Sequence, residues 1–170
     1  VTDYQNTSAF FDWNYSLVGY WSFDEYNSTG IFDNSTYDNL AFFRGGVSYN
    51  NITMGVYGKG IDLDGKWFDT KIPVIATENL EIGFSDMTIT AWIKTRDTAL
   101  PQFNGIVTKG AGTLTDEGYK FSYTGDSGEL LFWVSNGTDR YTTDSNDNLN
   151  LNDTQWHFVA FTINRSGNTN

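Results

Sequence analysis

Short runs of alternating apolar and polar residues, separated by turns, constrain this 170-residue chain more than any other feature. In the run at 87–94, Met, Ile, Ala and Ile take every second position, and Thr, Thr, Trp and Lys lie between them. Successive side chains of a β-strand point to opposite faces, so this run predicts a strand with one core face and one partly solvated face. No apolar stripe with the 3.6-residue period of a helix continues for three turns. The chain is therefore expected to be all-β.

Other runs rich in β-branched and aromatic residues lie between turns rich in Gly, Asn and Asp. The Gly-Asp-Ser-Gly turn at 125–128 and the Asn-Gly pair at 136–137 predict hairpins of an antiparallel meander. Many short strands with aromatic-rich interiors favour two antiparallel sheets packed face to face in a single domain. Besides 87–94, strands are expected at 17–24, 60–64, 68–74, 105–110, 118–124, 129–135, 139–144 and 155–164.

The acidic composition limits the partners that the chain can bind. Ten Lys and Arg against 21 Asp and Glu give a formal net charge of −11, which repels phosphate backbones and anionic lipid. Nucleic-acid binding and membrane insertion are therefore not expected. No apolar run approaches the ~20 residues that cross a bilayer, and the first residues, VTDYQNTSAF, lack the features of a signal peptide. An exported chain would thus be a mature or excised piece.

Asn-x-Ser/Thr triplets, the acceptors of N-linked glycan, are more frequent than the content of Asn, Ser and Thr gives by chance. This excess predicts a glycoprotein at the cell surface or outside the cell, although turns rich in Asn and Thr would also produce such triplets. The absence of cysteine excludes disulfides and thiol nucleophiles. The eight acceptor residues are Asn6, Asn14, Asn27, Asn34, Asn51, Asn136, Asn152 and Asn164.

Eight segments follow one another in a familiar order: LVGYWSFDE, DNSTYDNLAFF, GVYGKGIDLDG, DMTITAWIKT, GIVTKG, GYKFSYT, LLFWVS and DTQWHFVAFTIN. Together they resemble the laminin-G-like, concanavalin-A-like lectin/glucanase jelly roll, in the variant common in large surface proteins of archaea and bacteria. The resemblance implies an antiparallel β-sandwich over residues 17–170. Residues 1–16 precede the family's usual start and are expected to be an N-terminal extension or a donor strand.

The end of the pattern suggests an incomplete sandwich. In the resembling family, closing strands follow the WHFVAFT strand, and here RSGNTN follows Asn164. The strand at 155–164 is apolar on both faces, which is typical of a central strand. We therefore expect the closing strands to come from the remainder of a parent chain, from a neighbouring subunit, or from residues 1–16.

The stretch GYWSFDEYNSTGIFDNSTYDN, residues 19–39, concentrates the carboxylate and amide oxygens that calcium prefers. In the resembling family, the Asp of an Asp-x-Ser turn binds one such ion together with backbone carbonyls and an acid from a late strand. The resemblance implies a structural Ca²⁺ at Asp33, with Asn39 as its companion and Asp24 and Asp38 as further donors. The alternative is that these acids cap turns through side-chain hydrogen bonds. Both interpretations stay open.

The sequence contains no pattern of a catalytic site. Glycosidases of this fold carry paired carboxylates on one strand, commonly as Glu-x-Asp-x-x-Glu. The nearest acids here, Glu78 and Glu81, lie in an expected loop, and Asp62 and Asp64 are interpreted as solvated edge acids. The single histidine, His157, lies within an expected strand and has no nucleophile motif near it. No catalytic residue is therefore predicted.

Aromatic side chains are the candidates for sugar binding, since an aromatic ring suits the apolar face of a pyranose. Trp67, in the turn DGKWFDT, is the best candidate for an exposed ring. The tryptophans within expected strands, Trp21, Trp92, Trp133 and Trp156, are assigned to the core or to a sheet face.

These features predict a non-enzymatic binding or adhesion module of a larger surface protein, which recognises glycan or a partner protein. Two alternatives stay open. The first is a structural subunit or spacer of an extracellular filament or sheath. The second is an accessory domain of a carbohydrate-active enzyme.

Overall fold

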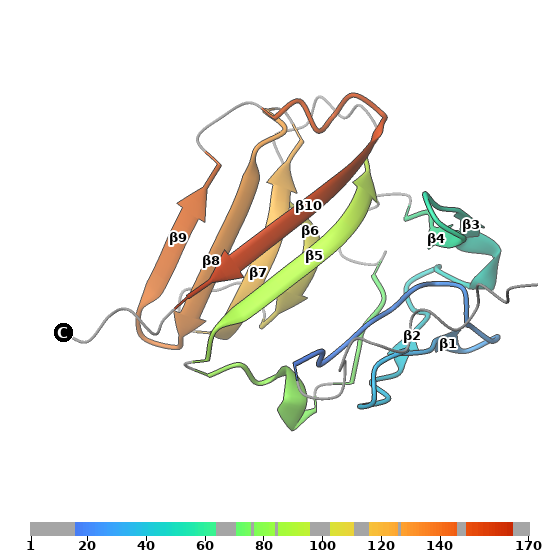
Figure 1. Ribbon diagram of the computed structural model, residues 1–170, viewed down its shortest axis with the longest axis horizontal. Coiled ribbons are helices and arrows are strands. Elements are labelled where there is room, and N and C mark those ends of the chain that lie inside the picture. Colours follow the sequence, from blue (N-terminus) through green and yellow to red (C-terminus); the bar gives the residue numbers. More distant parts are fainter. Residues whose placement is uncertain are drawn as a thin grey trace, which may run out of the picture. The chain divides into compact units, whose positions relative to one another are not determined.

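The computed structural model describes residues 16–63, 71–75, 77–83, 85–95, 103–110, 116–125, 127–145 and 149–164. The chain divides into two compact units, Val1–Glu81 and Ile82–Asn170, and each is described by itself (Figure 1). Apart from Ser16, the extension expected at residues 1–16 lies outside the described residues. Within the described residues, no helix has the length and apolar character to span a membrane.

The described part of the C-terminal unit contains six strands: β5 (Met87–Lys94), β6 (Phe103–Lys109), β7 (Glu117–Thr124), β8 (Leu130–Asn136), β9 (Arg140–Asp144) and β10 (Trp156–Ile163). They form a four-stranded antiparallel sheet of order β6-β7-β8-β9 and an antiparallel pair of β10 with β5. The two expected hairpins are present, and Gly128 and Gly137 in their turns have φ angles of 65° and 87°. Because such left-handed φ angles strain most other residues, glycine suits both turns.

An apolar core lies between the two sheets of the C-terminal unit. Phe121 of β7 and Phe132 of β8 are only 1% and 3% exposed. Phe161 of β10 stacks on Phe132, with 3.5 Å between ring centroids, and lies 6.3 Å from the Phe121 ring. Figure 1 shows β5 and β10 crossing over the four-stranded sheet. The contacts confirm the antiparallel β-sandwich that the sequence predicts.

Burial along β5 has the predicted period of two. The odd-numbered residues from Met87 to Ile93 are half-buried and pack on the core, and the even-numbered residues from Thr88 to Lys94 are exposed. β10 pairs with β5 along its whole length, with Val159 opposite Ala91. Within the described part of the chain, β10 pairs with β5 alone. The source of the expected closing strands stays a prediction.

The N-terminal unit has much shorter strands: β1 (Gly30–Ile31), β2 (Ala41–Phe42), β3 (Ile52–Met54) and β4 (Lys59–Ile61), with the 3-10 turns η2 (Tyr49–Asn51) and η3 (Glu78–Leu80). β1 pairs with β2, and β3 pairs with β4, both antiparallel. β1 and β2 approach so closely that a Cβ atom on Gly30 would lie 2.0 Å from the carbonyl oxygen of Ala41. A residue without a side chain is therefore required at this position.

One expected strand is wrong. Residues 17–24 form no strand, because their backbone groups bond to side chains from the next segment. The Tyr20 N–H donates to the Asp33 carboxylate, and Phe23 has a φ of 66°, which an extended strand does not allow. The strand expected at 68–74 is described only from Lys71 onwards, where Lys71 and Val74 each form a single bridge.

Candidate functional site

The carboxylate of Asp33 is the centre of a buried hydrogen-bond network in the N-terminal unit. Its Oδ1 accepts the backbone N–H of Tyr20 at 2.7 Å and that of Ser35 at 2.8 Å. Its Oδ2 accepts the Ser35 hydroxyl at 2.7 Å, the Asn39 N–H at 3.0 Å and Asn39 Nδ2 at 2.8 Å. Asp33 is 7% exposed. Five donors from three residues thus converge on one carboxylate, and we call this the Asp33 network.

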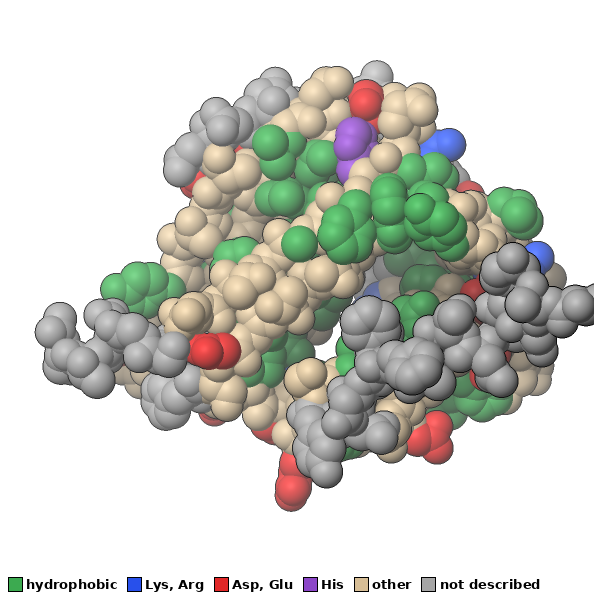
Figure 2. All heavy atoms as spheres, viewed as in Figure 1, with side chains coloured by type: hydrophobic (Ala, Val, Ile, Leu, Met, Phe, Trp, Pro, Cys, Tyr) green, Lys and Arg blue, Asp and Glu red, His purple; other side chains and the backbone are tan. Residues whose placement is uncertain are grey.

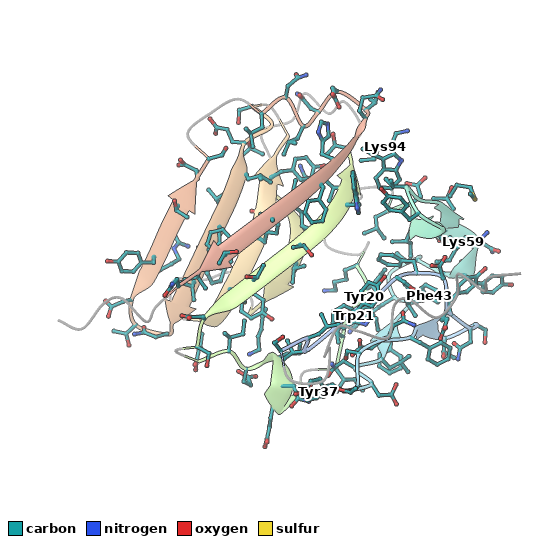
Figure 3. All side chains as sticks on the ribbon, in the orientation of Figure 1. Tyr20, Trp21, Tyr37, Phe43, Lys59 and Lys94 are labelled. Atoms are coloured by element: carbon teal, nitrogen blue, oxygen red, sulfur yellow. The ribbon has the colours of Figure 1, made fainter. Side chains whose placement is uncertain are left out.

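Asn39 extends the Asp33 network to more distant parts of the unit. It is 1% exposed, and its Nδ2 also donates to the Val18 carbonyl at 2.8 Å. Its Oδ1 accepts the Thr77 hydroxyl, and its backbone carbonyl accepts the Trp21 indole N–H at 3.0 Å. Figure 3 labels Tyr20 and Trp21, which lie in the segment before β1. One buried amide therefore joins three segments of the N-terminal unit.

The charge of Asp33 is stabilised by its donors. Burial raises the pKa of the carboxyl group, but the hydrogen bonds from Tyr20, Ser35 and Asn39 lower it by more, so the pKa lies below the usual value of 3.8. The side chain is therefore ionised at neutral pH, and its negative charge is balanced by N–H and O–H dipoles. No cation is needed to satisfy it.

The oxygens of Asp33 and Asn39, the expected calcium ligands, already accept hydrogen bonds from the protein. A calcium ion would take the place of donors at Asp33, because both carboxylate oxygens already accept hydrogen bonds. Asn39 Oδ1 is likewise bonded to Thr77. The described residues contain no group of three or more Asp, Glu or His able to hold a metal ion. As arranged here, Asp33 and Asn39 fit the hydrogen-bonded turn better than a calcium site, and a bound ion stays a prediction of the sequence.

The other two expected calcium ligands, Asp24 and Asp38, take no part in the Asp33 network. Asp24 Oδ1 accepts the Lys59 N–H at 2.8 Å, and a Cβ on Gly58 would lie 2.3 Å from the same oxygen. Asp24 therefore fixes the turn between β3 and β4. Asp38 is exposed and has a φ of 54°, a conformation that suits a tight turn. Asp24 thus has a local structural role, and Asp38 lies in a turn at the surface.

The acids considered for catalysis are solvent-accessible. Glu78 and Glu81 are exposed, at and just after η3, and Asp62 is exposed after β4. His157 lies in β10, as expected, and its Nε2 is 2.8 Å from Asp153 Oδ1. The hydrogen bond from His157, together with the backbone N–H of Gln155, lowers the pKa of Asp153. Among the described residues, the hydrogen bonds of His157 and Asp153 include no nucleophilic side chain.

The described tryptophans differ in their exposure to solvent. Trp67, the predicted sugar-stacking residue, and Asp64 lie outside the described residues. Trp133 of β8 is 4% exposed, and the Arg140 guanidinium lies 5.9 Å from its ring centroid. Trp92 of β5, by contrast, is 43% exposed. Trp92 is therefore an exposed aromatic ring on a strand of the sandwich, and the role of Trp67 stays a prediction.

Trp92 forms an aromatic pair with Phe158 on the solvent face of β5 and β10. The two residues are direct cross-strand partners, with ring centroids 5.4 Å apart and planes inclined by 56°. Phe158 is 57% exposed. Farther along the same face, the hydroxyls of Thr88 and Thr162 lie 3.1 Å apart, and Thr90 is also exposed. Figure 2 shows hydrophobic side chains over this pair of strands. We call these residues the aromatic face.

The two sheets and their core place the C-terminal unit among antiparallel β-sandwiches. A laminin-G family model, described as the concanavalin A-like lectin/glucanases superfamily, matches residues 69–170, which is more than half of the chain. The chain belongs to this superfamily. No curated protein and no solved structure matches it. The match covers β5–β10, and therefore includes the aromatic face.

Sequence reasoning selected neither Phe158 nor Trp92 as a ligand-binding residue, although the sequence carried a signal for Trp92. Trp92 alternates with Thr88, Thr90 and Lys94, so it belongs to the solvated face of its strand. Phe158 belongs to the same face because it pairs with Trp92, and this pairing depends on the register between two strands far apart in the sequence. The Asp33–Asn39 pair was predicted and is brought together, but by a direct hydrogen bond.

Proposed function

We propose that the chain is a non-catalytic binding module of an exported surface protein and that it recognises glycan through the aromatic face. The observation that supports this proposal is the exposed pair of Trp92 and Phe158 on one face of the sandwich. Large aromatic rings expose apolar area to water, and contact with a partner would bury this area favourably. Exposed aromatic pairs therefore mark candidate binding surfaces. The concanavalin A-like superfamily, which includes lectins, agrees with a carbohydrate ligand.

The chemistry of the face suits a sugar. Two aromatic rings at 56° to each other offer an angled apolar surface to the C–H groups of a pyranose. The neighbouring hydroxyls of Thr88, Thr90 and Thr162 can donate and accept hydrogen bonds with sugar hydroxyls. Lys94 is the charged residue at the exposed positions of β5. An uncharged or weakly acidic saccharide is therefore the expected class of ligand.

We also propose that the aromatic face binds sugar without hydrolysing it. A retaining glycosidase needs two carboxylates about 5 Å apart beside the scissile bond. The described aromatic face presents hydroxyls, aromatic rings and one ammonium group, without a carboxylate among the even-numbered residues of β5. Binding without turnover fits an adhesion module, whereas an accessory domain of an enzyme would show the same binding with the catalytic residues elsewhere in its parent chain.

The proposal is tested by measuring glycan binding for the wild-type chain and for Trp92→Ala and Phe158→Ala. A stacking contact contributes about 0.5–1.5 kcal/mol beyond its buried area, so each variant should bind at least about 2- to 12-fold more weakly. The matched control is Tyr141→Ala, because Tyr141 is also an aromatic residue on a strand and is 81% exposed. Its binding should equal that of the wild type.

Thermal melts of all four proteins separate binding from folding. The exposed positions predict similar melting temperatures, so a loss of binding would be local to the aromatic face. Unchanged binding in Trp92→Ala and Phe158→Ala, or an equal loss in Tyr141→Ala, would contradict the proposal. Binding of a surface protein instead of any glycan, lost in the same two variants, would replace the glycan with a protein partner.

A further inference from the structure

We propose that the fold divides the glycosylation triplets into two groups, according to the bonding of the asparagine side-chain nitrogen, Nδ2. Exposed asparagines whose Nδ2 makes no hydrogen bond within the described chain accept N-linked glycan. Half-buried asparagines whose Nδ2 donates a hydrogen bond to the backbone do not. The first group is Asn27, Asn34 and Asn136, and the second group is Asn51 and Asn152.

Asn27 shows the geometry of the first group most clearly. Its Oδ1 accepts the backbone N–H and the hydroxyl of Thr29, both at 2.7 Å, and the Gly30 N–H at 3.1 Å. Thr29 is the threonine of the same Asn-x-Thr triplet. These bonds fix the carboxamide, while Nδ2 makes no hydrogen bond to the described chain. The triplet is thus held in a turn with its nitrogen available for reaction.

Asn136 repeats this turn at the hairpin between β8 and β9. Its Oδ1 accepts the backbone N–H of Thr138 at 2.9 Å and of Asp139 at 2.7 Å. Asn34 uses a different partner, since its Oδ1 accepts the Ser22 hydroxyl at 2.9 Å. Both asparagines are exposed. In each case the oxygen is bonded, and the nitrogen makes no hydrogen bond to the residues that the structure describes.

Asn51 is built into the fold through both ends of its amide. Its Oδ1 accepts the Ser48 N–H at 3.0 Å, which completes the capping box of η2, and its Nδ2 donates to the Asp62 carbonyl at 3.1 Å. Asn152 is also half-buried, and its Nδ2 lies 3.5 Å from the carbonyl of Gly125, a buried residue. A glycan on either nitrogen would need space that the neighbouring backbone occupies. Attachment would therefore disrupt a contact that the folded chain uses.

Attachment of the glycan is a nucleophilic substitution at the anomeric carbon of the sugar. Nδ2 forms a bond to the anomeric carbon of a lipid-linked glycosyl phosphate, and one of its protons passes to a basic group of the glycosyltransferase. The bond between the anomeric carbon and the phosphate oxygen breaks, and the lipid phosphate leaves with the electron pair. The reaction requires a nitrogen that the sugar can reach. This requirement is met at the first group and not at the second.

The test is the occupancy of each triplet in the full chain, expressed in a host that performs N-linked glycosylation. Enzymatic release of the glycan in ¹⁸O-labelled water converts each occupied Asn to labelled Asp, which peptide mass spectrometry counts. Asn27, Asn34 and Asn136 should be mostly labelled, and Asn51 and Asn152 mostly unlabelled. A flexible triplet appended to the chain is the positive control that shows the host enzyme acting.

Two controls decide whether the fold causes the difference. Short peptides around Asn27 and Asn51 are given to the same transferase, and both should be modified, since neither peptide holds the contacts of the folded chain. Modification of Asn51 or Asn152 in the folded chain to the level of Asn27 would overturn the proposal. So would unlabelled Asn27, Asn34 and Asn136 beside an occupied control triplet, or a peptide around Asn51 that the transferase rejects.

Discussion

The two units of this chain are organised by different kinds of interaction. The C-terminal unit buries aromatic and aliphatic side chains between two sheets, with Phe121 and Phe132 almost fully covered. The N-terminal unit has strands of two or three residues, and its deeply buried residues include the polar side chains of Asp33 and Asn39. The C-terminal unit depends on buried apolar area, and the N-terminal unit depends on a set of directed hydrogen bonds to one carboxylate.

The comparison shows how differently the two interactions respond to change. Apolar burial is non-directional and is lost in proportion to the area removed. A buried carboxylate with five donors is sensitive to a change of a single atom, because donors that lose their acceptor remain unsatisfied in the interior. Small chemical substitutions should therefore be tolerated poorly at Asp33 and better in the sandwich core.

The largest expected effect is on the sandwich core. Phe121→Ala removes a ring that is 1% exposed, and such substitutions typically cost about 3–5 kcal/mol of unfolding free energy. The matched control is Phe158→Ala in the same unit, where the ring is 57% exposed, and its cost should be below about 1 kcal/mol. Urea unfolding measures both. Equal costs for the two variants would contradict the assignment of the core.

The next effect is at Asp33. Asp33→Asn keeps the shape of the side chain but replaces one accepting oxygen with an NH2 donor, which then faces the N–H and O–H groups that the oxygen had accepted. Hydrogen bonds to charged groups contribute about 1.5–3 kcal/mol, so a loss of about 2–3 kcal/mol is expected. The control is Asp38→Asn, five residues later, since Asp38 is exposed and asparagine tolerates its φ of 54°. A stable Asp33→Asn chain would show that the network is dispensable.

The pH dependence of the same pair of proteins follows from the pKa of Asp33. Because its folded-state pKa lies below 3.8, the unfolded chain takes up this proton at a higher pH than the folded protein does. The contribution of Asp33 is therefore complete above the unfolded-state pKa and is lost as the pH falls through the folded-state pKa. The stability gap between wild type and Asp33→Asn should be constant near neutral pH and shrink in acid. A stability gap that widens in acid would contradict the lowered pKa of Asp33 in the folded protein.

The smallest expected effect is that of calcium removal. If the donors of the Asp33 network satisfy the carboxylate directly, excess chelator should leave the melting temperature unchanged. A ligand that binds only the folded state raises stability by RT ln(1 + [L]/Kd). A clear fall in melting temperature with chelator, restored by added calcium, would therefore support the metal site that the family resemblance implies.

The sandwich was largely predictable because its signals are local. The alternation along residues 87–94, the dense apolar run at 156–163 and the Gly-containing turns at 125–128 and 136–137 each specify an element without reference to the rest of the chain. The expected strand at 17–24 failed for the opposite reason. Its Tyr20 N–H and Trp21 indole donate to residues 13 and 18 positions away, and no local pattern reports such partners.

The candidate sites show the same limit. The family resemblance implied that Asp33 and Asn39 share a calcium ion, and the structure joins the two side chains by a direct hydrogen bond. Carboxylate and amide oxygens suit both a cation and a set of donors, so composition could not distinguish the two. Trp92 was visible on a solvated strand face, whereas its contact with Phe158 required the register of β5 with β10. Pairing between distant strands is the information that the sequence pattern lacks.

Amide hydrogen exchange at Tyr20, Ser35 and Asn39 tests most directly whether hydrogen bonds to Asp33 organise the N-terminal unit. These three backbone N–H groups donate to the carboxylate, so they should exchange slowly in the wild type, equally slowly with chelator present, and much faster in Asp33→Asn. Fast exchange of all three in the wild type would contradict the network, as would protection that appears only when calcium is added.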